Sequence, residues 1–303
     1  MEKTIRNGQF AARISTHGAE LHSIQDAKGK EYLWQGDETT WTDHAPVLFP
    51  YIGRFTDGRY SYQGADYSMQ IHGLAMYSEF TVTEESDSRI TFALADNEET
   101  RKQYPFSFCF EVTYEWIGNR LEVLYRVKNT GTDPMYFAVG GHPGFCVPFE
   151  EGECFEDYQI EFSDSRKDAD SGKQCGQRPK KVEFSEDCYV LPVQPKEPER
   201  IENPLPLKHT LFDHDAIVME DAGDTVTLKS RKSGKSITVH FPKMDYLGIW
   251  HWPKAEVPYV CLEPWSSLPS RKGIVEDLEK KEDMLKVSAG EVYENLWTIE
   301  LEV

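Results

Sequence analysis

Alternating apolar and polar residues recur along most of the chain. The pattern is clearest from Phe106 to Trp116 and from Arg120 to Val127, on either side of an Ile117-Gly118-Asn119 turn. A period of two is typical of strands whose two faces meet different environments. The same pattern predicts further strands at Gln9 to Ile24 (two strands around a His17-Gly18 turn), Glu79 to Glu84, Arg89 to Ala95, Met135 to Val139, Tyr158 to Phe162, Lys181 to Phe184, Asp215 to Met219, Thr225 to Lys229, Ser236 to Phe241, Tyr246 to Trp252, Tyr259 to Trp265 and Glu291 to Val303.

Helical patterns are rare by comparison. Asp96 to Gln103 predicts one helical turn before Pro105, and Ile274 to Met284 predicts one short, highly charged helix. Asp57-Gly58 lies between two strand-like runs and predicts a hairpin, because Asp-Gly favours tight turns. The charged, Pro-rich region between about 150 and 205, which includes Asp164 to Gly176, is expected to form extended connections and edge hairpins.

This balance of elements indicates an all-β protein. Stacked antiparallel sheets are the natural way for so many strands to bury a face, so we expect a large antiparallel β-sandwich. All-β domains commonly exceed 200 residues, and residues 1–303 are expected to form a single domain.

Charge and hydropathy restrict the partners. The chain of 303 residues has a formal net charge of −19 and a pI near 4.9, which argues against nucleic acid and anionic membrane surfaces as partners. Met1 to Arg6 lacks the apolar run of a signal peptide, and no stretch of about 18 apolar residues occurs. We therefore expect a cytoplasmic protein, and a homodimer is left open by the sequence.

The cysteines show no metal-binding spacing. They form no C-x-x-C pair and have no histidine at zinc-finger spacing. We expect them to be reduced and structural, with no metal site. They are Cys109, Cys146, Cys154, Cys175, Cys188 and Cys261.

Two residues stand in unusual local sequences. His142 lies in Val139-Gly140-Gly141-His142-Pro143-Gly144-Phe145, which predicts a tight turn at the end of a strand, because glycine permits unusual backbone angles and proline fixes its own. Glu263 follows four residues of buried-strand character and precedes Pro264-Trp265, although ionised glutamate is rarely buried unless paired or used. If the fold brings them together they form an acid/base pair, although a lone histidine is more often structural.

Other reaction classes fit the sequence less well. No serine stands in a turn comparable to that of His142, which argues against a serine hydrolase triad. Glycosidase chemistry requires two carboxyl groups at the bond, and the sequence singles out only one, Glu263. Arg54 lies beside Pro50 and Gly53 in an otherwise apolar run, which weakens the ordinary interpretation of a surface ion pair.

Four segments together resemble the aldose 1-epimerase (galactose mutarotase) family, in the right order along most of the chain. The resemblance weakens between about 150 and 205. The segments are Phe49-Pro50-Tyr51-Ile52-Gly53-Arg54, Ile71-His72-Gly73, Gly141-His142-Pro143-Gly144-Phe145 and Cys261-Leu262-Glu263-Pro264-Trp265.

The resemblance implies a galactose mutarotase-type β-sandwich with a sugar cleft and no cofactor or metal. Glu263 would be the base that removes the proton of the anomeric hydroxyl, and His142 the acid that protonates the ring oxygen. Arg54, His72 and Asp215 would bind the sugar. Asp213 is the competitor of Asp215 for the acidic ligand.

One departure from the family pattern bears on the substrate. Relatives that act on hexose 6-phosphates carry an arginine shortly after the His-Gly pair, whereas this chain has His72-Gly73-Leu74-Ala75-Met76. Loss of a bidentate phosphate ligand in so acidic a protein favours a neutral aldohexose. The alternatives are a hexose-6-phosphate 1-epimerase and a carbohydrate-binding protein of the same fold without turnover.

Overall fold

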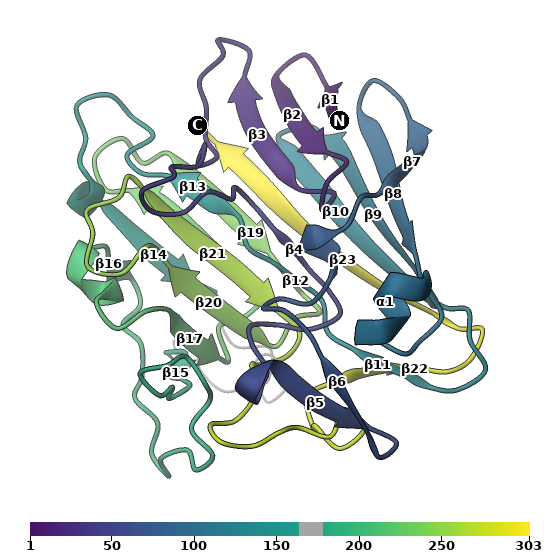
Figure 1. The fold of residues 1–303 in the computed structure, drawn as a ribbon. Coiled ribbons are helices and arrows are strands. Elements are labelled where there is room, and N and C mark those ends of the chain that lie inside the picture. The colour runs from purple at the N-terminus through teal and green to yellow at the C-terminus, as the bar shows by residue number, and fades with distance from the viewer. Residues whose placement is uncertain (164–177) are drawn as a thin grey trace, which may run out of the picture.

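A computed structural model describes residues 1–163 and 178–303, and strands dominate the described chain (Figure 1). The predicted all-β fold is confirmed, and every ladder between named strands is antiparallel. The nine-stranded sheet has the order β16 (Leu205–Pro206), β14 (Tyr158–Phe162), β18 (Thr225–Ser230), β19 (Ser236–His240), β23 (Val292–Glu302), β10 (Arg120–Asn129), β9 (Phe108–Ile117), β8 (Arg89–Ala95), β7 (Thr81–Glu85).

A seven-stranded sheet packs against it. The order is β15 (Lys180–Lys181), β17 (Ile217–Glu220), β20 (Tyr246–Trp250), β21 (Tyr259–Trp265), β12 (Gly140–Gly141) and β4 (Val47–Leu48), with β13 (Gly144–Cys146) also paired to β21. Three small sheets are formed by β1 (Glu2–Arg6), β2 (Phe10–Ser15) and β3 (Leu21–Asp26), by β5 (Arg59–Tyr62) and β6 (Ala65–Ser68), and by β11 (Met135–Phe137) and β22 (Leu285–Val287).

The core lies between the two large sheets. Along β10 every second residue from Leu121 onward is buried, as the alternating sequence predicts. The largest cluster of buried side chains joins this face to residues of β21, including Val260 and Leu262. The Tyr125 hydroxyl donates a hydrogen bond of 3.1 Å to the Gly140 carbonyl and so links β10 to β12. Figure 1 shows β20 and β21 lying across β14 and β19.

The helices are few and short. The predicted turn at Asp96 to Gln103 is confirmed as α1 (Glu98–Gln103), whose first turn is capped by the Asn97 side chain. The 3₁₀ segments are Thr56–Gly58, Ala75–Tyr77, Phe155–Asp157 and His209–Phe212. In the described parts of the chain, no helix has the length and apolar character needed to cross a bilayer.

The predicted helix at Ile274 to Met284 is wrong. This segment forms turns, because its backbone groups serve an edge of β5 instead of a helix. The Ser61 N–H donates to the Glu276 carbonyl at 2.8 Å, and the Leu278 N–H donates to the Ser61 carbonyl at 2.9 Å. A long-range pairing therefore overrides the local helical tendency.

The hairpin predicted at Asp57-Gly58 lies one turn further along the chain. Asp57 and Gly58 have positive φ, but they belong to a 3₁₀ turn that leads into β5. The hairpin joins β5 to β6 through Gln63-Gly64, whose φ values of 49° and 79° suit a two-residue turn.

The region between 150 and 205 contains β14 as predicted, but β15 covers only the start of the strand expected at Lys181 to Phe184. Asp164 to Gly176 lies outside the described residues.

Candidate active site

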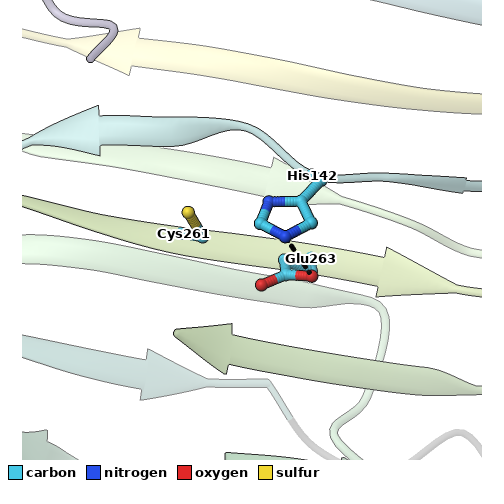
Figure 2. Close-up of side chains that lie close together, drawn as sticks. All are labelled: His142, Cys261 and Glu263. Carbon is cyan, nitrogen blue, oxygen red and sulfur yellow. Dashed lines mark ion pairs between the residues drawn. The ribbon is translucent and has the colours of Figure 1, made fainter. Parts of the chain in front are cut away.

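Glu263 lies on the outer face of β21, away from the core between the sheets. Val260 and Leu262 belong to that core, so the alternation of the strand turns Cys261 and Glu263 to the opposite side. Figure 2 shows the two side chains on the same strand. Glu263 is only 2% exposed although this face looks away from the core. It lies third from the end of the strand, and not at its end as predicted.

His142 lies opposite Glu263 in the sheet. The registers of β12 and β13 with β21 pair Gly140 with Trp265, Gly144 with Cys261, Phe145 with Val260 and Cys146 with Tyr259. Continuing this register places His142 across from Glu263, and its Nε2 is 3.2 Å from Glu263 Oε2 (Figure 2). The two residues therefore form a cross-strand pair on the face of the sheet.

The tight turn predicted around His142 is wrong. His142 and Pro143 form a break between β12 and β13, and neither Gly141 nor Gly144 has positive φ. Pro143 has no N–H to give to the ladder with β21, so the pairing is interrupted there. Gly141 is required for a different reason: a Cβ at this position would lie 2.8 Å from the Trp297 ring. These two neighbours hold His142 at one place along β21, as the sequence suggested.

Burial dominates the electrostatics of the pair. Burial raises the pKa of Glu263 well above its ordinary value, and the nearby charge of Asp215 raises it further. Burial lowers the pKa of His142 to about 4. The environment therefore favours the arrangement in which both groups are uncharged.

Aromatic rings surround His142. Its ring centroid lies 5.0 Å from that of Trp41, and 5.6 Å from those of both Trp250 and His72. Its Nδ1 has no hydrogen-bond partner within the described residues. Only Nε2, which faces Glu263, is placed to exchange a proton with a neighbour.

His72 is held by a tight loop rather than by a strand. Its φ is 62°, and its Nδ1 accepts a hydrogen bond of 3.1 Å from the Gly53 N–H. Burial lowers the pKa of His72 well below its ordinary value, so the neutral ring carries its proton on Nε2. Gly73 makes the loop possible, because a Cβ there would lie 2.3 Å from the Phe49 carbonyl oxygen.

Arg54 follows Gly53 and is exposed at the same cavity as His72. No carboxylate of a described residue forms an ion pair with its guanidinium. Its carbonyl accepts a hydrogen bond from the Ser270 N–H, which ties the turn to the segment after β21. Its five donors therefore have no described carboxylate partner to compete with a ligand.

Asp215 lies two residues before β17, in a strained loop conformation with φ of 77°. One carboxylate oxygen accepts from the Ala216 N–H at 2.8 Å, and the other accepts from the Cys188 thiol at 2.9 Å. Burial, followed by the hydrogen bond to Asp215 and then its charge, raises the pKa of Cys188 to about 12, so the sulfur keeps the proton that it donates. Cys188 also has positive φ, at 65°.

These five residues line one cavity of about 300 Å³, a volume at the lower end of the range of small-molecule sites. The five predicted site residues, Arg54, His72, His142, Asp215 and Glu263, are all among its walls. Asp213, the competitor of Asp215, does not line the cavity.

Several other wall residues were not predicted from the sequence. They are Trp41, Asp43, Cys188, Trp250 and Trp252 among others. Trp250 is the last residue of β20, and Trp252 follows just after it, so an aromatic strand end in the sequence marks both. Trp41 and Cys188 lie in irregular segments whose sequence carries no comparable signal.

One group of described side chains offers ligands for a metal ion. The ligand atoms of His142, Cys261 and Glu263 all lie within 4.8 Å of one another (Figure 2). Cys261 does not line the cavity, and its side chain is fully buried beside Gly144.

The sequence of the chain is similar to those of known proteins. Residues 1–283 match the sequence profile of the aldose 1-epimerase family. The chain belongs to this family. Among curated proteins, it is 33% identical over 292 residues to the chromosomal protein LacX of Lactococcus lactis subsp. lactis, and the match covers 93% of each chain.

Solved structures from the family resemble the whole described fold. A galactose mutarotase related enzyme from Lactobacillus acidophilus has a TM-score of 0.90 and 33% identity, and the match covers 100% of this chain and 98% of that one. A galactose mutarotase-like protein from Lactobacillus casei has a TM-score of 0.88 and 32% identity, with 99% and 100% covered. The predicted galactose mutarotase-type fold is therefore confirmed.

Proposed function

We propose that this protein is an aldose 1-epimerase that interconverts the α and β anomers of a neutral aldohexose. The observation that carries the proposal is the contact of 3.2 Å between His142 and Glu263, two buried titratable groups in the wall of one cavity. Membership in the aldose 1-epimerase family supports the same reaction.

In the proposed reaction, Glu263 removes the proton of the anomeric hydroxyl while His142 Nε2 protonates the ring oxygen. The bond between the anomeric carbon and the ring oxygen breaks and leaves an open-chain aldehyde. The aldehyde rotates about the bond to the second carbon, and the ring closes on its other face with the two roles reversed. Each positioned group accelerates the reaction about 10²–10⁴-fold.

The pair begins and ends each half-reaction with the same number of protons. Imidazolium with carboxylate passes to imidazole with carboxylic acid, because one proton leaves His142 as another reaches Glu263. Burial favours the uncharged arrangement, which is the state of the pair when the sugar ring is open. The cycle therefore needs no proton from solvent.

The other predicted residues would hold the sugar. The Nε2–H of His72 and the guanidinium of Arg54 are donors for ring or hydroxyl oxygens, and Asp215 is an acceptor for hydroxyl groups. Donors beside the ring oxygen would also stabilise negative charge that develops there.

The charges of the cavity support a neutral sugar. Its described walls include the carboxyl groups of Asp43, Asp215 and Glu263 against one arginine, Arg54, and no lysine. Met76 lines the cavity at the place where the hexose-6-phosphate pattern carries arginine. A phosphate dianion would find a single cationic partner there, Arg54, and would lie near the Asp215 carboxylate.

We further propose that the enzyme acts in the cytoplasm. Five cysteines lie in the described residues and all are free, which suits a reducing compartment. Cys175 lies outside the described residues.

The experiment is a polarimetric assay with freshly dissolved α-galactose and, separately, α-glucose. The protein should accelerate the change in optical rotation over a buffer blank, and His142→Asn should remove the acceleration. Glucose 6-phosphate, assayed by anomer-specific coupling, should respond more weakly. Sugar binding without acceleration by any sugar would instead identify a carbohydrate-binding protein.

A further inference from the structure

We propose that His142, Cys261 and Glu263 form a binding site for a zinc ion, and that zinc and sugar exclude each other. The three side chains supply nitrogen, sulfur and oxygen, which are the ligand atoms that zinc accepts in proteins. The hard cations Mg²⁺ and Ca²⁺ do not suit this set, because they require mostly oxygen ligands.

The geometry of the group is close to that of a zinc site. The three ligand atoms lie within 4.8 Å of one another, and His142 Nε2 and Glu263 Oε2 are already 3.2 Å apart. Zinc bonds of about 2.0–2.3 Å to N, O and S in a tetrahedron separate the ligand atoms by about 3.5 Å. A side-chain movement of roughly 1 Å would therefore close the group around the ion.

The charge of the filled site would be balanced. Binding breaks the S–H bond of Cys261, releases its proton to solvent and forms a zinc–thiolate bond, with no change in oxidation state. One thiolate and the Glu263 carboxylate then offset the two positive charges of zinc, while His142 binds as a neutral ring. A buried ion needs this compensation, and Glu263 and Cys261 are 2% and 0% exposed.

The position of the group defines its access and its effect. Figure 2 shows His142 reaching toward Glu263 from the segment beside β21, with Cys261 earlier on the same strand. His142 and Glu263 line the cavity and Cys261 does not, so the ion would enter from the cavity and keep its fourth position toward it. Zinc would occupy the proton-transfer atoms and inhibit turnover. This inhibitory effect rests on the proposed function, whereas the binding does not.

Substitution of Cys261 tests the metal site independently of the proposed reaction. The proposed acid/base steps make no use of the thiol, so Cys261→Ala removes a metal ligand and leaves both proton-transfer groups. Cys154 provides a matched control, because it is an exposed thiol with its own carboxylate neighbour: its sulfur lies 3.2 Å from Asp157 Oδ2.

The first measurement is a calorimetric titration of the chelator-treated protein with Zn²⁺, repeated with galactose present. We expect one site that Cys261→Ala weakens at least about tenfold, the loss that even outer partners of a metal site produce. Cys154→Ala should bind like the wild type, and galactose should weaken binding. Equal affinity in wild type and Cys261→Ala, or no binding, would overturn the proposal.

A second measurement guards against misfolding of the alanine variant. Co²⁺ bound to the wild type should give a thiolate-to-metal absorption band in the near ultraviolet, and Cys261→Ser should lack it while keeping the wild-type circular dichroism spectrum. A band that persists in Cys261→Ser would overturn the assignment. Neither measurement requires turnover, so an inactive protein that binds zinc would disprove the proposed function alone.

Discussion

The two sides of the cavity are built differently. His142 and Glu263 belong to one register of the seven-stranded sheet, where neighbouring strand residues fix them from both directions. His72 and Asp215 lie in loops with φ of 62° and 77°, a region that costs a non-glycine residue of order 1 kcal/mol or more. The sheet positions the groups that we propose transfer protons, and strained loops position the groups that we propose bind the sugar.

The two kinds of support suit two different requirements of the proposed function, proton transfer and sugar recognition. Proton transfer needs two groups at a fixed separation, which a cross-strand pair provides. Recognition of a sugar needs donors and acceptors aimed inward from several directions, which loops around a sheet provide. We therefore expect substitutions on the sheet to act on kcat and substitutions in the loops to act on KM.

The largest effect is expected for Glu263→Gln. The amide cannot take the proton of the anomeric hydroxyl, so kcat should fall about 10²–10⁴-fold. Polarimetry measures the rate, and urea unfolding checks that the sheet is intact. Glu220→Gln on β17, which β20 separates from β21 in the same sheet, is the control and should keep full activity. Normal exchange in Glu263→Gln would contradict the assigned role.

A smaller effect is expected for Asp215→Asn. The amide loses one charged acceptor for a sugar hydroxyl, so KM should rise about tenfold or more while kcat changes less. Asp213→Asn, two residues away and outside the cavity, should leave both constants unchanged. If Asp215→Asn lowers kcat with KM unchanged, the division between sheet and loops does not hold.

Local sequence patterns predicted the sheet side of this comparison well. Alternation places Glu263 on a different face from Val260 and Leu262, and a glutamate in such a strand is anomalous by itself. His142 was marked by its glycine and proline neighbours. What local sequence could not supply was the register that sets His142 opposite Glu263, since that depends on two strands far apart in the chain.

The loop side was predictable only in part. Arg54, His72 and Asp215 came from resemblance to the aldose 1-epimerase family, while Trp41 and Cys188 lie in irregular segments without a periodic signal. The helix expected at Ile274 to Met284 fails for a related reason, because pairing with Ser61 is a non-local contact. The expected single domain and a homodimer stay predictions.

The smallest effect is expected from His22, which supports the loop that carries Trp41. Trp41 packs against His142, and the chain just after it is held by Glu20, whose carboxylate accepts from the His44 N–H at 2.8 Å. His22 lies between two carboxylates, with Nε2 at 3.3 Å from Glu20 and Nδ1 at 3.0 Å from Glu2. The charge of His22 thus supports the segment that covers the proposed acid.

The pH dependence of this support has a defined sign. Burial lowers the pKa of His22, but hydrogen bonds and charge from Glu20 and Glu2 outweigh it and raise the pKa above 6.5. A raised pKa means that the stabilisation is complete below 6.5 and is lost as pH rises through the folded-state value. As the pH rises from 6.5 through the folded-state pKa of His22, the free energy of unfolding of the wild type should fall relative to that of His22→Gln. The expected fall is less than about 1 kcal/mol, measured by urea unfolding. A gain with rising pH would show that the ring is not charged in the fold.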